Sequence, residues 1–140
     1  MGELTATGLS TASADAVLVV DSIQFAEPLP DALRECRRIL LPGGRVVVTC
    51  WEALDADDGR LSPRLRQMDL GRQLPRAGFV DAEVVDRPAW RLAEQALSQE
   101  ALTVEVGDDL AVRSMQEEAQ RVLATFDGLR RVLATARAPR

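Results

Sequence analysis

The chain has 140 residues and a mass of 15.3 kDa, which is enough for one domain with its own core. It contains no His, no Lys and no Tyr, so the commonest general base near neutral pH, a Schiff-base amine and a phenolic acid are all excluded. The net charge of −5 argues against a nucleic-acid partner, which requires clustered cations.

The first predicted element is a strand, because residues 14–20 (ADAVLVV) are almost continuously apolar. This pattern is typical of a parallel-sheet strand that is covered on both faces. Residues 1–13 are small and polar and form a lead-in, with a short strand expected near 3–7. Pro28, Pro30 and Asp31 then start a helix whose apolar face is formed by Leu33, Cys36 and Leu40.

The Pro42-Gly43-Gly44 turn is expected to end this helix and to lead into a second buried strand over residues 45–50. Residues 52–59 form a loop rich in Asp and Ala. The remaining predicted elements are a helix over 64–77 interrupted at Gly71, a strand over 79–85, helices over 88–102 and 108–126, and a final strand over 129–136.

The two cysteines, Cys36 and Cys50, are not spaced as a zinc-binding pair, so we expect no metal site. Both are interpreted as buried apolar residues in a reducing cytoplasm. The sequence shows no signal peptide and no apolar run long enough to cross a membrane, and a cytoplasmic location is expected.

The order of these elements resembles the C-terminal half of class I S-adenosylmethionine-dependent methyltransferases of the small-molecule type. The resemblance is carried by SADAVLVVDSIQFAEP from Ser13, DALRECRRILLPGGRVVVT from Asp31, LPRAGFVDAEV from Leu74 and RRVLATAR from Arg130. It implies one truncated α/β, Rossmann-like domain over residues 1–140. Helices are expected on both faces of the sheet, and residues 86–126 form a helical cap region.

The sequence departs from the family at two functional positions. The first strand and the glycine-rich loop that hold the cofactor have no counterpart, and Phe25 lies where many relatives carry a catalytic His. No cofactor is therefore expected. The strand at Ala16–Val20 would be left as an apolar edge, which either a second copy of the chain or the N-terminal segment would have to cover; a homo-oligomer is the preferred expectation.

Ligands of open α/β sheets bind beyond the carboxyl ends of the strands. The candidate residues for a hydrophobic small-molecule substrate are Ser22, Gln24, Phe25, Trp51, Met68, Trp90 and Met115. For Met68, Trp90 and Met115, simple core packing is the competing interpretation. Asp21 and Glu52 are candidate acids or bases, although Asp21 could equally accept hydrogen bonds from a turn, and no catalytic residue is assigned.

The resemblance extends to small methyltransferase-like cyclases of bacterial polyketide pathways. A pericyclic cyclisation needs no nucleophile, base or metal, so an apolar cavity that folds a polyene into its reactive conformation would be sufficient. The sequence therefore favours a cofactor-independent cyclase of secondary metabolism. The alternatives are a non-catalytic subunit that completes a methyltransferase and a residual methyltransferase.

Overall fold

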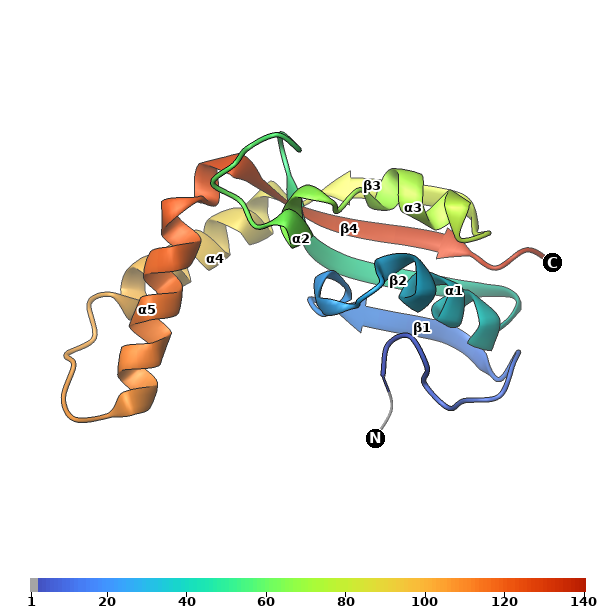
Figure 1. The fold of residues 1–140 in the computed structure, drawn as a ribbon, viewed down its shortest axis with the longest axis horizontal. Helices are drawn as coiled ribbons and strands as arrows, with labels where there is room; N and C mark the ends of the chain where they lie inside the picture. Colours follow the sequence, from blue (N-terminus) through green and yellow to red (C-terminus); the bar gives the residue numbers. More distant parts are fainter. Residues whose placement is uncertain (1–2) are drawn as a thin grey trace.

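The computed structural model describes residues 3–140 and shows a four-stranded sheet with helices along one face and a helical hairpin at one end (Figure 1). The strands are β1 (Ala14–Val20), β2 (Leu40–Ala53), β3 (Val80–Asp86) and β4 (Leu129–Arg137). Their order is β1-β2-β4-β3, with β1 parallel to β2, and β4 antiparallel to both β2 and β3. The expected truncated, Rossmann-like α/β arrangement is confirmed.

Helix α1 (Leu29–Ile39) connects β1 to β2, and the short η1 (Ile23–Phe25) precedes it. The helix ends one residue before the apolar Leu40, which was expected to be helical but instead pairs with Ala14 at the start of β2. The strand continues through the Pro42-Gly43-Gly44 turn, where Gly43 has a φ of +77°. A Cβ on Gly44 would lie 3.0 Å from the Asp15 carbonyl oxygen, so glycine is required where β1 and β2 approach each other.

The expected helix over 64–77 is two helices, α2 (Pro63–Arg66) and α3 (Leu70–Arg76). The break lies at 67–69 rather than at Gly71, because the Asp69 side chain accepts a hydrogen bond from the Arg72 N–H and thereby starts a new helix. The lead-in shows only an isolated bridge between Glu3 and Ala6 instead of a strand. Residues 1 and 2 of the lead-in lie outside the described part.

The core lies between the sheet and helices α1 and α3. Side chains of a strand alternate between its two faces, and every second residue points toward these helices. The sheet residues of this core include Val19, Val46, Val48, Cys50, Val132, Ala134 and Ala136, and they pack against Leu33, Cys36, Leu70 and Leu74 of the helices. The apolar periodicity of α1 and α3 therefore produces the helix-covered face.

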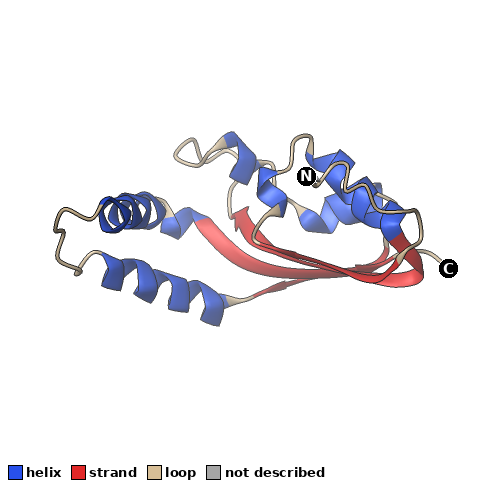
Figure 2. Ribbon diagram, turned by 90° about the horizontal axis from the view of Figure 1, so that it is seen from below, coloured by secondary structure: helices blue, strands red, loops and turns tan. Residues whose placement is uncertain are grey.

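The opposite face, here called the open face, carries Leu18, Val20, Val47, Leu133 and Val85, which the strand registers place side by side. None of these residues belongs to the core cluster, and Leu18 and Val20 are 68% and 56% exposed. Figure 2 shows α1, α2 and α3 on one side of the sheet and the other side largely bare. On the open face, the helix expected there is represented by α4, which contacts the start of β4 where Arg131 reaches Glu94.

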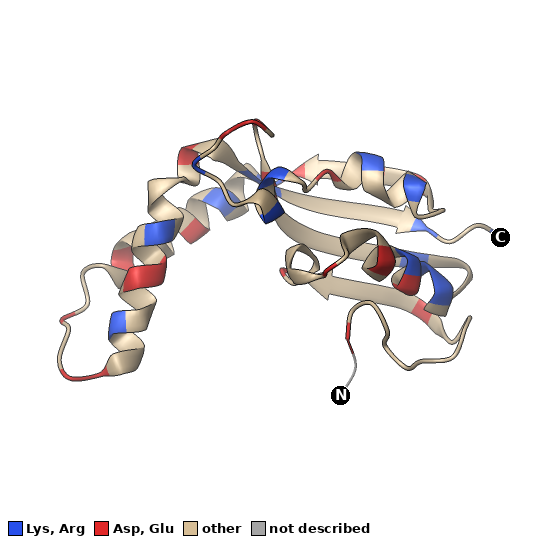
Figure 3. Ribbon diagram, viewed as in Figure 1, with Lys and Arg blue, Asp and Glu red and all other residues tan. Residues whose placement is uncertain are grey.

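The hairpin of α4 (Pro88–Ala101) and α5 (Leu110–Ala124) extends beyond the end of the sheet and is joined to β4 by η2 (Phe126–Gly128). Arg91 holds it in place by donating hydrogen bonds to the Leu129 and Phe126 carbonyl oxygens, with its guanidinium 4.4 Å from the Phe126 ring centre. Both helices carry acidic and basic residues (Figure 3): Arg91, Glu94 and Glu100 on α4, and Arg113, Glu117, Glu118 and Arg121 on α5. Within residues 3–140 no helix is both long and apolar enough to cross a membrane.

Candidate functional site

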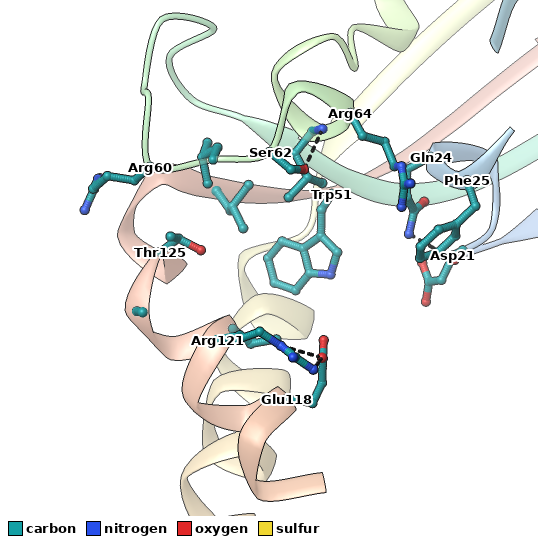
Figure 4. A pocket seen from close by; sticks show the side chains of 15 residues that line it. Asp21, Gln24, Phe25, Trp51, Arg60, Ser62, Arg64, Glu118, Arg121 and Thr125 are labelled. Atoms are coloured by element: carbon teal, nitrogen blue, oxygen red, sulfur yellow. Dashed lines mark hydrogen bonds and ion pairs between the residues drawn. The ribbon is translucent and has the colours of Figure 1, made fainter. Parts of the chain in front are cut away.

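A cavity of about 830 Å³ lies beyond the carboxyl ends of β1 and β2, where the hairpin leaves the sheet (Figure 4). We call it the strand-end cavity. Its lining comes from the end of β1, from η1, from β2, from residues 60–65, from α5 and from the start of β4. The residues are Asp21, Gln24, Phe25, Trp51, Arg60, Leu61, Ser62, Arg64, Leu65, Glu118, Arg121, Val122, Ala124, Thr125 and Leu129.

Trp51 lies on the cavity side of β2 because its neighbour Cys50 points into the core. Its ring meets the Phe126 ring edge-to-face, with centroids 5.6 Å apart and an angle of 70° between the planes. The Arg131 guanidinium lies 5.3 Å from the indole centre. These two contacts fix the plane of the indole, so Trp51 offers a ligand a rigid aromatic surface.

Beside Trp51, Arg131 joins three elements. Its side chain reaches from β4 and donates to Asp21 after β1 and, at 2.7 Å, to Glu94 on α4. Burial opposes the charge of this 4% exposed guanidinium, but the bonds to Asp21 and Glu94 raise the pKa of Arg131 above its usual value. Asp21 also accepts a 2.9 Å hydrogen bond from the Thr49 hydroxyl. Asp21 is thus held as an ion-pair partner.

The loop before α2 is fixed by Arg60, which donates to both Asp58 and Asp127. These hydrogen bonds raise the pKa of Arg60 further above its already high value. Gly128 lies against this cluster, and a Cβ there would come within 2.8 Å of an Asp58 carboxylate oxygen. On α5, Arg121 pairs with Glu118 across one helical turn.

Glu52 follows Trp51 but lies outside the strand-end cavity. It is only 2% exposed, accepts a 2.8 Å hydrogen bond from the Leu70 N–H at the start of α3, and accepts a 2.6 Å bond from Arg130. All of its contacts are therefore within the fold. Burial also raises the pKa of the Cys36 thiol to about 11 and that of the Cys50 thiol to about 12, so neither is a thiolate near neutral pH.

Comparison with known proteins identifies the fold. The family described as "Methyltransferase domain" matches residues 1–48. No curated protein sequence matches the chain. The structure resembles a putative sarcosine dimethylglycine methyltransferase from Galdieria sulphuraria, with a TM-score of 0.80 and 18% identity over 99% of this chain and 58% of that one. The chain has the fold of the class I methyltransferases.

Two further solved structures share the fold. A phosphoethanolamine N-methyltransferase 2 from Haemonchus contortus gives a TM-score of 0.71 and 20% identity over 99% of this chain and 36% of that chain. The [4+2]-cyclase SpnF gives a TM-score of 0.66 and 22% identity over 98% of this chain and 54% of that chain. This chain thus spans between about a third and three fifths of the solved structures it matches, and the expected resemblance to part of a class I methyltransferase is confirmed.

Class I methyltransferases use S-adenosylmethionine, which is bound where a strand leads through a glycine-rich loop into a helix. Within residues 3–140, β1 leads through Asp21 and Ser22 into a single turn of 3₁₀ helix, and β2 leads into the acidic loop from Leu54. The described residues therefore do not fit the adenosyl part of this cofactor. Nor does any group of three or more acidic or Cys side chains among them lie close enough together to hold a metal ion.

The structure brings some of the predicted site residues together. Gln24, Phe25 and Trp51 line the strand-end cavity. Met68, which belongs to the core, touches an adjoining cavity of about 630 Å³ lined also by Gln24, Phe25 and Arg64. Ser22, Trp90 and Met115 line neither cavity, and Trp90 on α4 lies instead against the guanidinium of Arg87, the residue before the helix. Met115, expected to face inward on its helix, is 41% exposed.

Residues that close the strand-end cavity from the other side were not among the predicted ones. They include Arg60, Leu61, Ser62 and Leu65 before and within α2, and Arg121, Val122 and Thr125 on and after α5. One signal was available, since Ser62-Pro63 is a helix start: the Ser62 hydroxyl accepts from the Leu65 N–H. A helix that starts directly after the β2 loop must lie near the strand ends. No comparable signal marks the α5 residues.

Proposed function

We propose that this chain binds an apolar small molecule in the strand-end cavity and promotes its cyclisation without a cofactor. The observation that carries the proposal is the state of the charged side chains there. Asp21, Arg60 and the Glu118–Arg121 pair are engaged in ion pairs within the protein, and Arg64 stacks on Phe25. The cavity therefore offers a ligand mainly its shape and the indole of Trp51.

Shape alone can accelerate one class of reaction. In a [4+2] cycloaddition within one molecule, the two π bonds of a diene and the π bond of an alkene are replaced by two C–C σ bonds and one new π bond, and no atom, proton or electron leaves. The barrier includes the entropy of folding a flexible chain, and a rigid apolar cavity can lower it by on the order of several kcal/mol. The fold is compatible with such a reaction, since the [4+2]-cyclase SpnF shares it.

Methyl transfer is the second candidate, because most of the solved structures of this fold that resemble the chain are methyltransferases, several in complex with S-adenosylmethionine or its product. In that case the cofactor would have to be held by a segment other than the described residues. A non-catalytic subunit that completes such an enzyme is a third candidate, and it would use the free edge of β1.

We also propose that a second copy of the chain covers this edge. Strand β1 pairs only with β2 among the described strands, and its Leu18 and Val20 are exposed on the open face. Residues 3–13 form no backbone hydrogen bond with β1, since Ala12 and Ser13 bond to the end of α1 and Thr7 bonds to Glu35. Sedimentation of the purified chain tests this proposal, and a stable monomer would contradict it.

The activity is tested with a linear substrate in which a conjugated diene and an electron-poor alkene are joined by a flexible saturated tether. Product is measured with and without added S-adenosylmethionine, in wild-type protein and in the Trp51→Ala variant. The expected result is that the wild-type protein cyclises the substrate faster than buffer does. This acceleration should be lost in Trp51→Ala and should not change when the cofactor is added. A methylated product that requires the cofactor would instead support methyl transfer, and no acceleration would count against the cyclase.

A further inference from the structure

Gln24 occupies the boundary between the two cavities described above. It lies on η1 and lines both the strand-end cavity and the adjoining cavity, and Phe25, Ser62 and Arg64 form the rest of the shared wall. In Figure 4 the side chains of Gln24, Phe25 and Arg64 lie side by side at one end of the strand-end cavity, opposite the α5 residues. A ligand longer than either cavity would have to pass this wall.

The orientation of the Gln24 amide is fixed by its hydrogen bond. One end of the amide lies 3.0 Å from the Asp21 main-chain carbonyl oxygen, which can only accept a hydrogen bond. The NH₂ group must therefore face Asp21, and the Oε1 atom must face the other way. This oxygen is shielded from solvent and has no hydrogen-bond partner in the described structure. A shielded acceptor without a donor is unfavourable, so a ligand that supplies one gains affinity.

The side chains between the two cavities are weakly held. Phe25 is 63% exposed, and its ring lies 5.0 Å from the Arg64 guanidinium carbon. Arg64 forms no ion pair within residues 3–140. Such an exposed cation–π contact is worth little, so a ligand can displace both side chains and reach the amide of Gln24.

We propose that Gln24 is a specificity-determining residue that accepts a hydrogen bond from a neutral hydroxyl group of the ligand. This inference rests on the proposed binding of an apolar molecule in the strand-end cavity. Arg60 and Arg121 of that cavity are ion-paired, but Arg64 forms no ion pair within residues 3–140 and disfavours a cationic donor such as an ammonium group, while a deprotonated anionic group has no proton to give. The substrate class is therefore an elongated apolar alcohol whose hydroxyl lies at the boundary between the two cavities.

Two isomeric probes, n-octanol and heptyl methyl ether, test the inference because they have the same atoms but only the alcohol donates a hydrogen bond. Binding is followed by indole fluorescence in a Trp90→Phe background, in which Trp51 is the sole tryptophan. The expected preference for the alcohol is about three- to tenfold, the value of one neutral hydrogen bond. Gln24→Met, which keeps the side-chain length without the acceptor, should reduce this preference to about one.

Gln99→Met, the same substitution at an exposed position on α4, is the matched control and should keep the preference. Gln24→Asn has a shorter amide that cannot reach both Asp21 and the ligand, so it should also lose the preference for the alcohol. It replaces Gln24→Met in the experiment if that variant folds poorly. Equal binding of both probes by the parent protein, or a preference that survives in Gln24→Met, would overturn the role of Gln24. If neither probe changes the Trp51 fluorescence, the proposed cavity binding fails instead.

Discussion

The pair formed by Glu52 and Arg130 should respond to substitution in an asymmetric way. Glu52 is 2% exposed, whereas the Arg130 side chain is 42% exposed. Removing Arg130 leaves a buried carboxylate whose one remaining partner is the Leu70 N–H, and such an unpaired buried charge costs about 3–5 kcal/mol. Glu52→Gln keeps an acceptor for Leu70 and lets Arg130 turn to water, so it loses one charge-assisted hydrogen bond, about 2 kcal/mol.

The asymmetry is measured by urea unfolding of Glu52→Gln, Arg130→Met and the double variant, followed by far-ultraviolet circular dichroism. Arg130→Met should be the less stable single variant, although it changes the more exposed residue. Adding Glu52→Gln to it should restore stability, because no buried charge remains, and the coupling free energy should be about 2–3 kcal/mol.

Glu83→Gln is the matched control for this series, since Glu83 is exposed on β3, and it should change stability by less than about 0.5 kcal/mol. Additive single effects, or a larger loss in Glu52→Gln than in Arg130→Met, would refute the reasoning. Either result would mean that the Glu52 carboxylate is hydrated rather than held by its two partners.

Three further outcomes are expected. Trp51→Ala should weaken binding of an apolar ligand, and lower turnover, by about tenfold or more in fluorescence and rate assays, whereas Asp55→Ala in the exposed loop should not. Hydrogen bonds from Arg38 and Thr7 lower the pKa of Glu35 from 4.5 to about 2. The stabilisation of the fold by this carboxylate is therefore complete above pH 4.5 and is lost as the pH falls toward 2. In acid unfolding, the Glu35→Gln variant should not show this part of the loss of stability. Arg91→Leu should speed amide hydrogen exchange in the hairpin but not in β2.

The sheet and its connections could be predicted from the sequence because their signals are local. The run from Ala14 to Val20, the turn at Pro42-Gly43-Gly44 and the helix start at Pro88 each specify an element within a few residues. The failures at element ends have tertiary causes. Leu40 leaves the helical pattern because it pairs with Ala14, a contact that no window around Leu40 contains.

The open face shows a different limit of sequence patterns. Continuous apolarity in β1 predicted a strand covered on both faces, yet Leu18 and Val20 remain exposed. The hydrophobic pattern of a strand indicates which side chains are apolar, but it does not indicate which other element of the fold covers them. For the same reason the bounds of α4 and α5 were predicted well, whereas the pattern did not indicate which of their residues face the strand ends.

The position of the hairpin decides which candidate residues form a site, and it depends on contacts between residues far apart in the chain. Arg131 and Asp21 are 110 residues apart in sequence, and Arg91 reaches 38 residues to the Leu129 carbonyl oxygen. These contacts direct Arg121 and Thr125 to the cavity and leave Trp90 and Met115 outside it. The residue types of Trp90 and Met115 on the hairpin helices were thus a weaker indication of the site than the buried Arg131, which fixes the position of α4 through Glu94.

The same arginine explains why the cavity has so little chemistry of its own. Arg131 occupies the carboxylates of Asp21 and Glu94 and stacks on Trp51, so the groups that could have acted as acid or base at the strand ends instead hold the fold together. The shielded Oε1 of Gln24 remains beside them without a donor. If the proposed binding is right, a site with paired charges, a fixed indole and the Gln24 acceptor would select a ligand by its shape and by one hydroxyl.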